Sequence, residues 1–234
     1  SGNGEIYVMD ADGANEVRLT VHRSPDRRPV WSPEGSLIAF ESERDGNTEL
    51  YVMNPDGTGI TRLTTNVVAD YGLEWSPDGS LIAFSSGGDI QVIRRDGTDL
   101  RGVTSGPASD EFPAWSPDGS RLVFESESDG NRDVFIVNLD GTETVRLTDA
   151  PTRDSSPDWS PDGTRIVFES SGEGGADIFL VSQDGSGLTN LSNAPGSDLS
   201  PTWSPAGRHV AFVTDRDGNP EIYVMNADGT GVTR

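Results

Sequence analysis

The chain has 234 residues, with 39 acidic against 17 basic side chains, a formal net charge of −22 and no cysteine. This charge disfavours nucleic acid and anionic membrane surfaces as partners and favours cationic ones, and it also fits adaptation to salt. The lack of cysteine excludes disulfides, thiol catalysis and cysteine-ligated zinc. No run of residues approaches the roughly 18 apolar residues of a membrane span, so we expect no membrane insertion.

A repeated unit organises the chain. The motif Trp-Ser-Pro-x-Gly contains every tryptophan of the sequence and begins at Trp31, Trp75, Trp115, Trp159 and Trp203. An Asp-Gly turn recurs at the same interval of about 44 residues. A period in this range, carried by β-patterned segments and tight turns, is typical of a propeller blade of four short antiparallel strands.

The predicted elements are all strands. The chain opens with two strand-like segments, 5–9 and 17–20, which match the last two strands, C and D, of a unit. In the first complete unit, strand A ends at Trp31, and strands B, C and D cover 37–40, 50–53 and 60–64. These segments are rich in aromatic and β-branched residues, and proline and glycine mark tight turns between A and B and between C and D. The fold class is therefore all-β.

The repeats predict one β-propeller domain over 1–234. It consists of a C–D hairpin at 1–24 followed by five complete four-stranded blades at 25–68, 69–108, 109–152, 153–196 and 197–234. The hairpin is an extra half blade, so the arrangement is of a six-bladed type that is incomplete or open. Because exposed strand edges and apolar faces are seldom tolerated, we expect self-association through the incomplete ring or cover by another partner. The alternative is a closed five-bladed ring with one terminal hairpin displaced.

Matching positions in the repeats predict the core. Each strand A carries a tryptophan, and each strand B carries a phenylalanine at one position, namely Phe40, Phe84, Phe124, Phe168 and Phe212. Stacked blades bury such rings between neighbours.

Two stretches carry a family resemblance. Trp-Ser-Pro-Asp-Gly-Ser-Arg-Leu-Val-Phe at 115–124 and the segment 215–230, with Tyr-Val-Met-Asn-Ala-Asp-Gly-Thr, resemble the TolB-like propeller repeat, also called the PD40 or WD40-like repeat. The resemblance covers essentially the whole chain. It implies a six-bladed ring, usually bacterial, often periplasmic or extracellular, that serves mainly as a platform for protein interaction. Similar repeats also form the non-catalytic propeller of some serine peptidases.

The inventory of reactive side chains argues against an enzyme. His22 and His209 are the only imidazoles, neither repeats, and no Gly-x-Ser-x-Gly elbow is present. No spacing singles out a pair of carboxylates. We therefore expect no catalytic residues.

The variable loops predict the binding face. Since strands alternate in direction, the A–B and C–D turns lie on one side of a blade and the B–C and D–A loops on the other. The B–C loop runs over 42–48 in one unit and shrinks to 86–88 in the next. Loop variation on a rigid scaffold is the usual location of recognition, so we expect a protein or peptide to bind on the side of the D–A and B–C loops.

The candidate partner-binding residues lie at the start of strand A on that side. The repeats diverge there, whereas a purely structural position would favour one residue type, and aromatic and Arg side chains are enriched in interface hot spots. The candidates are Arg27, Arg28, Tyr71, Glu111, Phe112 and Leu199. Local packing or scattered exposure is the alternative interpretation.

An aspartate precedes each tryptophan by five residues, at the entry to strand A. The set is Asp26, Asp70, Asp110, Asp154 and Asp198. In a closed ring it would form an acidic collar around the channel mouth, able to attract a cationic partner. The alternative is that each carboxylate caps its own turn or bonds to the next blade.

Calcium is possible at this collar, but the spacing is not that of an EF-hand loop, so we expect no metal site and no cofactor.

The sequence thus favours a non-enzymatic scaffold for protein or peptide interaction. The alternatives are a regulatory or substrate-gating propeller from a larger hydrolase and a carbohydrate-active propeller, the latter suggested by Tyr71 near Glu74 and Glu111 beside Phe112.

Overall fold

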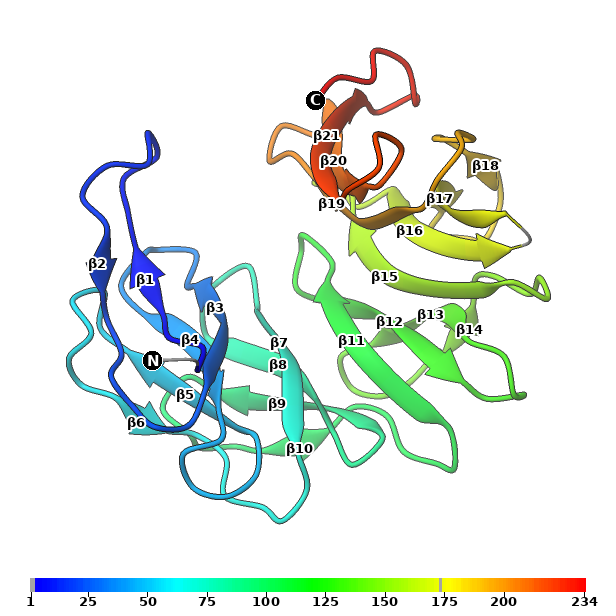
Figure 1. Ribbon diagram of the computed structural model, residues 1–234. Helices are drawn as coiled ribbons and strands as arrows, with labels where there is room; N and C mark the ends of the chain where they lie inside the picture. The colour runs from blue at the N-terminus through cyan, green and yellow to red at the C-terminus, as the bar shows by residue number, and fades with distance from the viewer. Residues whose placement is uncertain (1–2, 173) are drawn as a thin grey trace. The chain divides into compact units, whose positions relative to one another are not determined.

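A computed structural model describes residues 3–172 and 174–234, which contain β-strands and no helix (Figure 1). The chain divides into two compact units, Ser1–Gly102 and Val103–Arg234. Each unit is built from antiparallel sheets that follow the chain in order, as expected for propeller blades.

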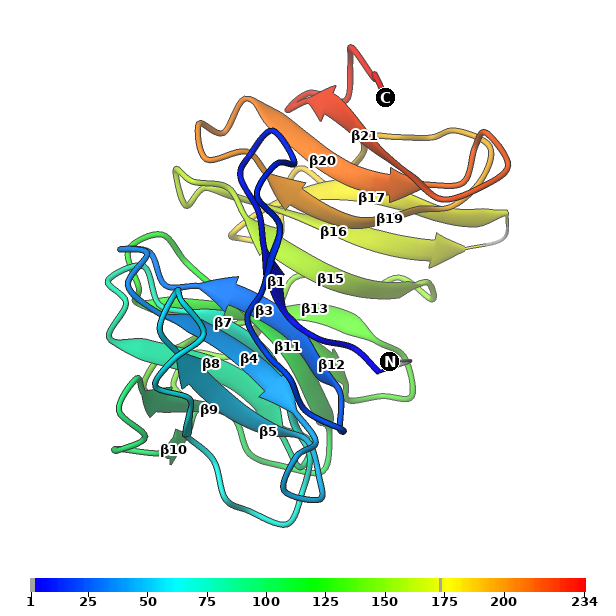
Figure 2. The same cartoon turned by 60° about the vertical axis from the view of Figure 1, so that its left-hand side comes forward.

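Unit 1 contains a two-stranded hairpin and two four-stranded blades (Figures 1 and 2). The hairpin is formed by β1 (Tyr7–Val8) and β2 (Val17–Arg18). The first blade comprises β3 (Asp26–Trp31), β4 (Ile38–Ser42), β5 (Glu49–Met53) and β6 (Thr61–Arg62). The second blade comprises β7 (Asp70–Trp75), β8 (Leu81–Ser86), β9 (Asp89–Arg94) and β10 (Arg101–Gly102).

Unit 2 contains the other three blades. The third comprises β11 (Ser109–Trp115), β12 (Arg121–Glu127), β13 (Asp133–Asn138) and β14 (Val145–Arg146). The fourth comprises β15 (Arg153–Trp159), β16 (Arg165–Gly172), β17 (Gly175–Ser182) and β18 (Thr189–Asn190). The fifth comprises β19 (Asp198–Trp203), β20 (His209–Thr214) and β21 (Glu221–Asn226).

The fifth blade corrects the prediction of five complete four-stranded blades. Its sheet has three strands, and the expected strand D is reduced to a single bridge between Val224 and Thr233. Strand D pairs through only two residues in the other blades, for example at Thr61 and Arg62, so the loss of one pair leaves a bridge.

The Trp-Ser-Pro-Asp-Gly motif is the turn between strands A and B. In the second blade, Gly79 donates its N–H to the Ser76 carbonyl oxygen at 2.9 Å, and the Ser76 hydroxyl accepts the Leu81 N–H at 3.0 Å. Asp78 accepts hydrogen bonds from the Ser76 hydroxyl and the Ser80 N–H. Gly79 has φ +68°, a conformation that favours glycine. The recurrence of the motif therefore reflects a turn in which each polar group has a partner.

The apolar core lies between neighbouring blades of a unit, as predicted. Between the first and second blades, Leu50 and Val52 pack with Trp75 and Phe84. All five strand-B phenylalanines are buried. A strand B that is covered on both sides explains why its residues are apolar in succession instead of alternating.

Trp31 is an exception to the predicted core. It is 46% exposed, whereas Trp75 is 5% exposed and donates its indole N–H to the carbonyl oxygen of Val30 in the preceding blade. The hairpin that precedes the first blade supplies Ile6, which packs with Phe40. In the described part of unit 1, this hairpin consists of β1 and β2 alone and includes no strand A that could cover Trp31.

Candidate functional site

A bulge in strand A positions the predicted partner-binding residues. In every blade the pairing of strands A and B shifts two residues after the aspartate, between Arg27 and Val30 in the first blade and between Tyr71 and Glu74 in the second. The residue in the bulge has a left-handed backbone in all five blades, namely Arg28 (φ +48°), Gly72 (φ +67°), Phe112 (φ +51°), Ser156 (φ +53°) and Ser200 (φ +51°). Bulges turn a side chain away from the regular pleat, which brings it to the loop side of the blade.

The bulge also joins neighbouring blades through a glutamate of strand B, which is buried at Glu41 and Glu125 and half-buried at Glu169. The Gly72 N–H donates to Glu41 at 2.7 Å, the Ser156 N–H to Glu125 at 3.0 Å and the Ser200 N–H to Glu169 at 2.7 Å. Sequence reasoning missed these three glutamates. The signal was a charged residue directly after the buried phenylalanine, since a charge in a buried strand requires a partner.

A cleft of about 260 Å³ lies on the side of unit 1 that carries the D–A and B–C loops. Its lining residues are Pro25, Arg27, Arg28, Glu41, Ser42, Glu43, Thr48 and Tyr71. The structure therefore brings together three of the predicted partner-binding residues, from strand A of the first blade and strand A of the second.

The cleft contains charges of both signs. Arg27 lies 3.1 Å from Glu43, with both side chains well exposed, and Arg28 lies 3.8 Å from the buried Glu41. Burial raises the pKa of Glu41, and the Gly72 N–H and the Arg28 guanidinium oppose that rise. The cleft is thus lined by one buried carboxylate and by two arginines.

The other three predicted partner-binding residues lie in unit 2. Glu111 and Phe112 are half-buried in β11, and Glu111 forms an ion pair with Arg132 at 3.1 Å. Leu199 in β19 is 36% exposed.

The five aspartates of the predicted collar are buried, each at or near the start of strand A. Each is held by a side chain of its own blade or of the loop before it. The donors are Arg44 for Asp26, Asn66 for Asp70, Ser126 for Asp110, Ser170 for Asp154 and Arg216 for Asp198. They therefore differ from an exposed acidic collar. Packing of the blade removes these carboxylates from bulk water, so hydrogen-bond donors of nearby side chains stabilise them instead.

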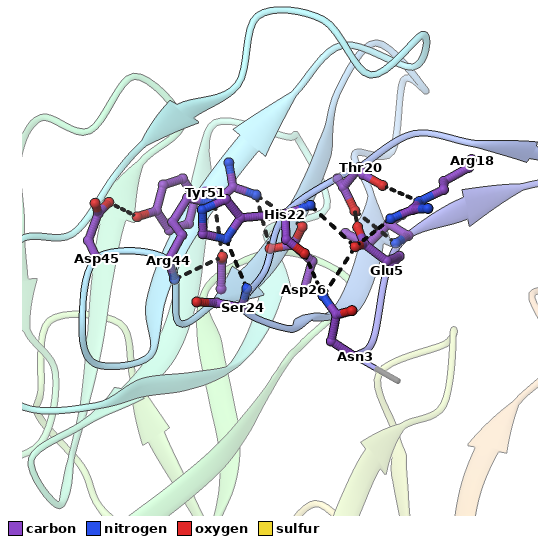
Figure 3. A network of polar contacts seen from close by, with 12 residues as sticks. Asn3, Glu5, Arg18, Thr20, His22, Ser24, Asp26, Arg44, Asp45 and Tyr51 are labelled. Carbon is purple, nitrogen blue, oxygen red and sulfur yellow. Dashed lines mark hydrogen bonds and ion pairs between the residues drawn. The ribbon is translucent and has the colours of Figure 1, made fainter. Parts of the chain in front are cut away.

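Figure 3 shows how the aspartate of the first blade is fixed. Arg44 reaches across to Asp26 and lies over the Tyr51 ring, 4.8 Å from its centroid, while the Tyr51 hydroxyl donates to Asp45. The contact of Asp45 to a tyrosine gives this loop residue a structural role.

The hairpin has its own polar centre at Glu5, which Figure 3 also shows. Arg18 lies 2.6 Å from the Glu5 carboxylate, and the Thr20 hydroxyl donates to it at 2.9 Å. The His22 N–H also donates to Glu5, and the His22 Nδ1 accepts the Ser24 N–H at 3.1 Å, so His22 is part of a turn. His209 lies exposed at the start of β20.

Residues 3–172 and 174–234 contain no group of three or more His, Asp or Glu side chains arranged to hold a metal ion. Within the same ranges there is no helix that could cross a membrane.

Comparisons with known proteins agree with the architecture. The family model described as the TolB beta propeller domain, PD40, matches residues 1–111 and 89–193. The Tol-Pal system protein TolB of Syntrophotalea carbinolica is 50% identical over 38 residues, which are 16% of this chain and 9% of that protein. The matched segment is thus a small part of that relative.

Two solved structures extend the comparison over nearly the whole chain. Putative TolB from Agrobacterium tumefaciens superposes with a TM-score of 0.78 and 27% identity, over 94% of this chain and 83% of that one. A puromycin-hydrolyzing peptidase of Mycobacterium tuberculosis superposes with a TM-score of 0.80 and 17% identity, over 99% of this chain and 41% of that one, and shows the fold alone. With the repeat motifs, the blade topology and a family match over most of its length, the chain belongs to the TolB β-propeller family.

Proposed function

We propose that this protein is a non-enzymatic scaffold that binds a protein or peptide on the side of its D–A and B–C loops. The single observation that carries this function is the cleft of unit 1, where Arg27, Arg28 and Tyr71 lie together. Arginine and tyrosine are the side chains enriched at the centres of interfaces, and a concave surface lets them surround an inserted side chain. Glu111, Phe112 and Leu199 are proposed to extend the binding surface in unit 2.

The experiment is affinity capture from an extract with a triple variant. Tyr71→Ala, Phe112→Ala and Arg27→Glu together should reduce capture of the partner while leaving the melting temperature almost unchanged, because these residues contribute little to the core between blades. The matched control is Arg95→Glu, a charge reversal on the C–D turn of unit 1 at a side chain that is 52% exposed, against 61% for Arg27. If the triple variant captures every partner as the unaltered protein does, the proposed binding side is wrong.

We also propose that the N-terminal hairpin is the C–D half of a further blade. The Leu19 carbonyl oxygen lies 2.7 Å from the position that a Gly57 Cβ would occupy, and the Leu63 carbonyl oxygen lies 3.7 Å from the corresponding position at Gly97 in the next blade. A strand pair from a second copy or another partner would then cover Trp31. Light scattering at several concentrations tests this arrangement, and a strictly monomeric protein at all of them would exclude self-association.

A periplasmic or extracellular location is proposed from the similarity to a Tol-Pal system protein. Detection of the protein in the cytoplasmic fraction of the source cell would contradict it.

The second candidate function is that of a gating propeller within a larger hydrolase. It is favoured by the superposition on a peptidase of which the chain matches 41%. A catalytic domain with its own Ser and His, encoded next to this segment, would decide for this alternative.

A further inference from the structure

The first and third blades differ at one position on the loop side. Thr48 directly precedes Glu49, the first residue of β5, and Arg132 directly precedes Asp133, the first residue of β13. The two residues therefore occupy the same place in their repeats. Arg132 contacts Glu125 of its own strand B, and Thr48 lines the cleft together with Glu41.

In the third blade, Arg132 fills this place. Its guanidinium contacts Glu125, lies 3.1 Å from Glu111 and 3.7 Å from Glu127, and its side chain is only 13% exposed. Glu125 also accepts the Ser156 N–H through its other oxygen. Both oxygens of this carboxylate are thus occupied, one by a backbone N–H of the next blade and one by an arginine.

In the first blade, the corresponding carboxylate belongs to Glu41, and only one of its oxygens accepts a hydrogen bond from the described residues. Oε1 of Glu41 accepts the Gly72 N–H, and Arg28 is 3.8 Å away, beyond hydrogen-bond distance. In the part of the chain that the structure describes, these are the contacts of the Glu41 carboxylate, so Oε2 has no hydrogen-bond donor of its own. The side chain of Glu41 is 8% exposed.

The fourth blade shows that the open oxygen is not a general feature of these glutamates. There, one oxygen of Glu169 accepts the Ser200 N–H and the other accepts the Ser155 hydroxyl at 2.9 Å. Of the three glutamates that join blades, Glu41 is the one with an oxygen that lacks a hydrogen-bond donor in the described part of the chain, and Glu41 lines the cleft of unit 1.

In the first blade, the position of Arg132 is taken by Thr48, which lines the cleft. Thr48 is too short to reach Glu41, and the space it leaves belongs to the cleft of about 260 Å³. Tyr71 and Pro25 also line it and can contact an aliphatic stem or the face of a guanidinium.

We infer that the cleft of unit 1 binds an arginine side chain of the partner, whose guanidinium donates to Oε2 of Glu41 as Arg132 donates to Glu125. The charges that face this position are Glu41 and Glu43, which attract a guanidinium, and Arg27 and Arg28, which repel it. The Arg27 side chain is 61% exposed, so it can turn away from the bound guanidinium and contact an acidic or carbonyl group of the partner beside it. The net charge of −22 further favours a basic ligand. This inference rests on the proposed function in that a protein or peptide supplies the arginine.

The test is an NMR titration of the ¹⁵N-labelled chain with acetyl-Gly-Arg-Gly-amide. The Gly72 amide is the reporter because its N–H binds Glu41, and the Ser156 amide is the internal control because its glutamate is already occupied by Arg132. We expect a saturable shift at Gly72 and none at Ser156. The citrulline peptide, which has the same shape without the charge, should bind about tenfold more weakly, because charge-assisted hydrogen bonds to a carboxylate are stronger than neutral ones.

Two variants complete the experiment. Thr48→Arg should abolish the shift by filling the cleft from within, and Thr48→Val, which matches threonine in size, should bind the peptide like the unaltered chain. A Gly72 amide that does not respond, equal binding of the citrulline peptide, or full binding by Thr48→Arg would overturn the inference. If capture still depends on the loop side while the Gly72 amide does not respond, the arginine site is wrong and the proposed function stands.

Discussion

Arg44 binds both carboxylate oxygens of Asp26, at 2.9 and 3.0 Å, through a single guanidinium nitrogen. The Asp26 side chain is fully buried and that of Arg44 is mostly so. Removing one partner of a buried ion pair leaves the other without compensation and typically costs about 3–5 kcal/mol. We therefore expect Asp26→Ala to lower the free energy of unfolding by about this amount, as measured by urea denaturation.

The matched variant is Asp110→Ala, because Asp110 occupies the same place in the third blade but accepts its hydrogen bond from the neutral Ser126. Its cost should be smaller, about 1–3 kcal/mol, since no charge is left unpaired. Equal losses in the two variants would mean that Arg44 contributes nothing specific.

Two tryptophans with the same place in the repeat should differ in their contribution to stability. Trp75→Ala removes a buried ring and should cost about 3–5 kcal/mol. Trp31→Ala removes a ring that is 46% exposed and should cost clearly less. Thermal unfolding of the two variants checks the difference. Similar losses would indicate that Trp31 is covered in solution, as self-association would require.

The blade contact at Glu41 should depend on its ability to accept a hydrogen bond rather than on its charge. Glu41→Ala leaves the Gly72 N–H without its acceptor, and an unsatisfied buried donor costs about 1–3 kcal/mol. Glu41→Gln keeps a carbonyl oxygen at the same place. Denaturation curves of both variants at neutral pH separate the two effects, and the contact is not structural if Ala and Gln behave alike.

The contribution of Glu41 to the free energy of unfolding should also depend on pH, in a direction set by its raised pKa. Burial raises the pKa of Glu41 in the folded chain above its ordinary value of 4.5, so its contribution to stability is full below pH 4.5 and is lost as the pH rises through the folded pKa. Glu41→Gln does not titrate. Its stability relative to the unaltered chain should therefore increase with pH over this range, and a constant difference would contradict the assignment.

The A–B turns should show the opposite behaviour. Hydrogen bonds from Ser116 and Ser120 lower the pKa of Asp118 from 3.8 to about 2, and those from Ser160 and Thr164 do the same for Asp162. Their contribution is present above pH 3.8 and is lost as the pH falls through about 2. The double variant Asp118→Asn and Asp162→Asn should thus be less stable than the unaltered chain at neutral pH, with a gap that narrows in acid. Urea denaturation as a function of pH measures that gap.

The sequence predicts the strands and turns well because each rests on local chemistry that recurs. Phe40 and its counterparts mark strand B, and the Ser-Pro-Asp-Gly turn satisfies its own polar groups within five residues. The bulge at Arg28 and Gly72 was not predicted, because a shift of one residue in the pairing depends on the partner strand and leaves no trace in the apolar period.

Three residues of the candidate cleft were indicated by a local feature of the sequence. Divergence after the aspartate indicated Arg27, Arg28 and Tyr71, which the structure brings to one cleft. The burial of Asp26 was not foreseen, because its partner Arg44 is 18 residues away in a loop that varies between repeats. The exposure of Trp31 depends on which strands cover it, which a repeat motif does not encode.

The hydrogen bond that joins neighbouring blades at Glu41, Glu125 and Glu169 is donated by the main chain. Every residue type except proline has that N–H, so the side chain at the bulge can change while the contact is kept. The left-handed backbone costs a non-glycine residue about 1–2 kcal/mol, and glycine and serine both occupy the donor position here. The side chain at the bulge and the contact between blades can therefore vary independently. A library randomised at the bulge would alter what the surface recognises and would keep the hydrogen bond that joins the blades.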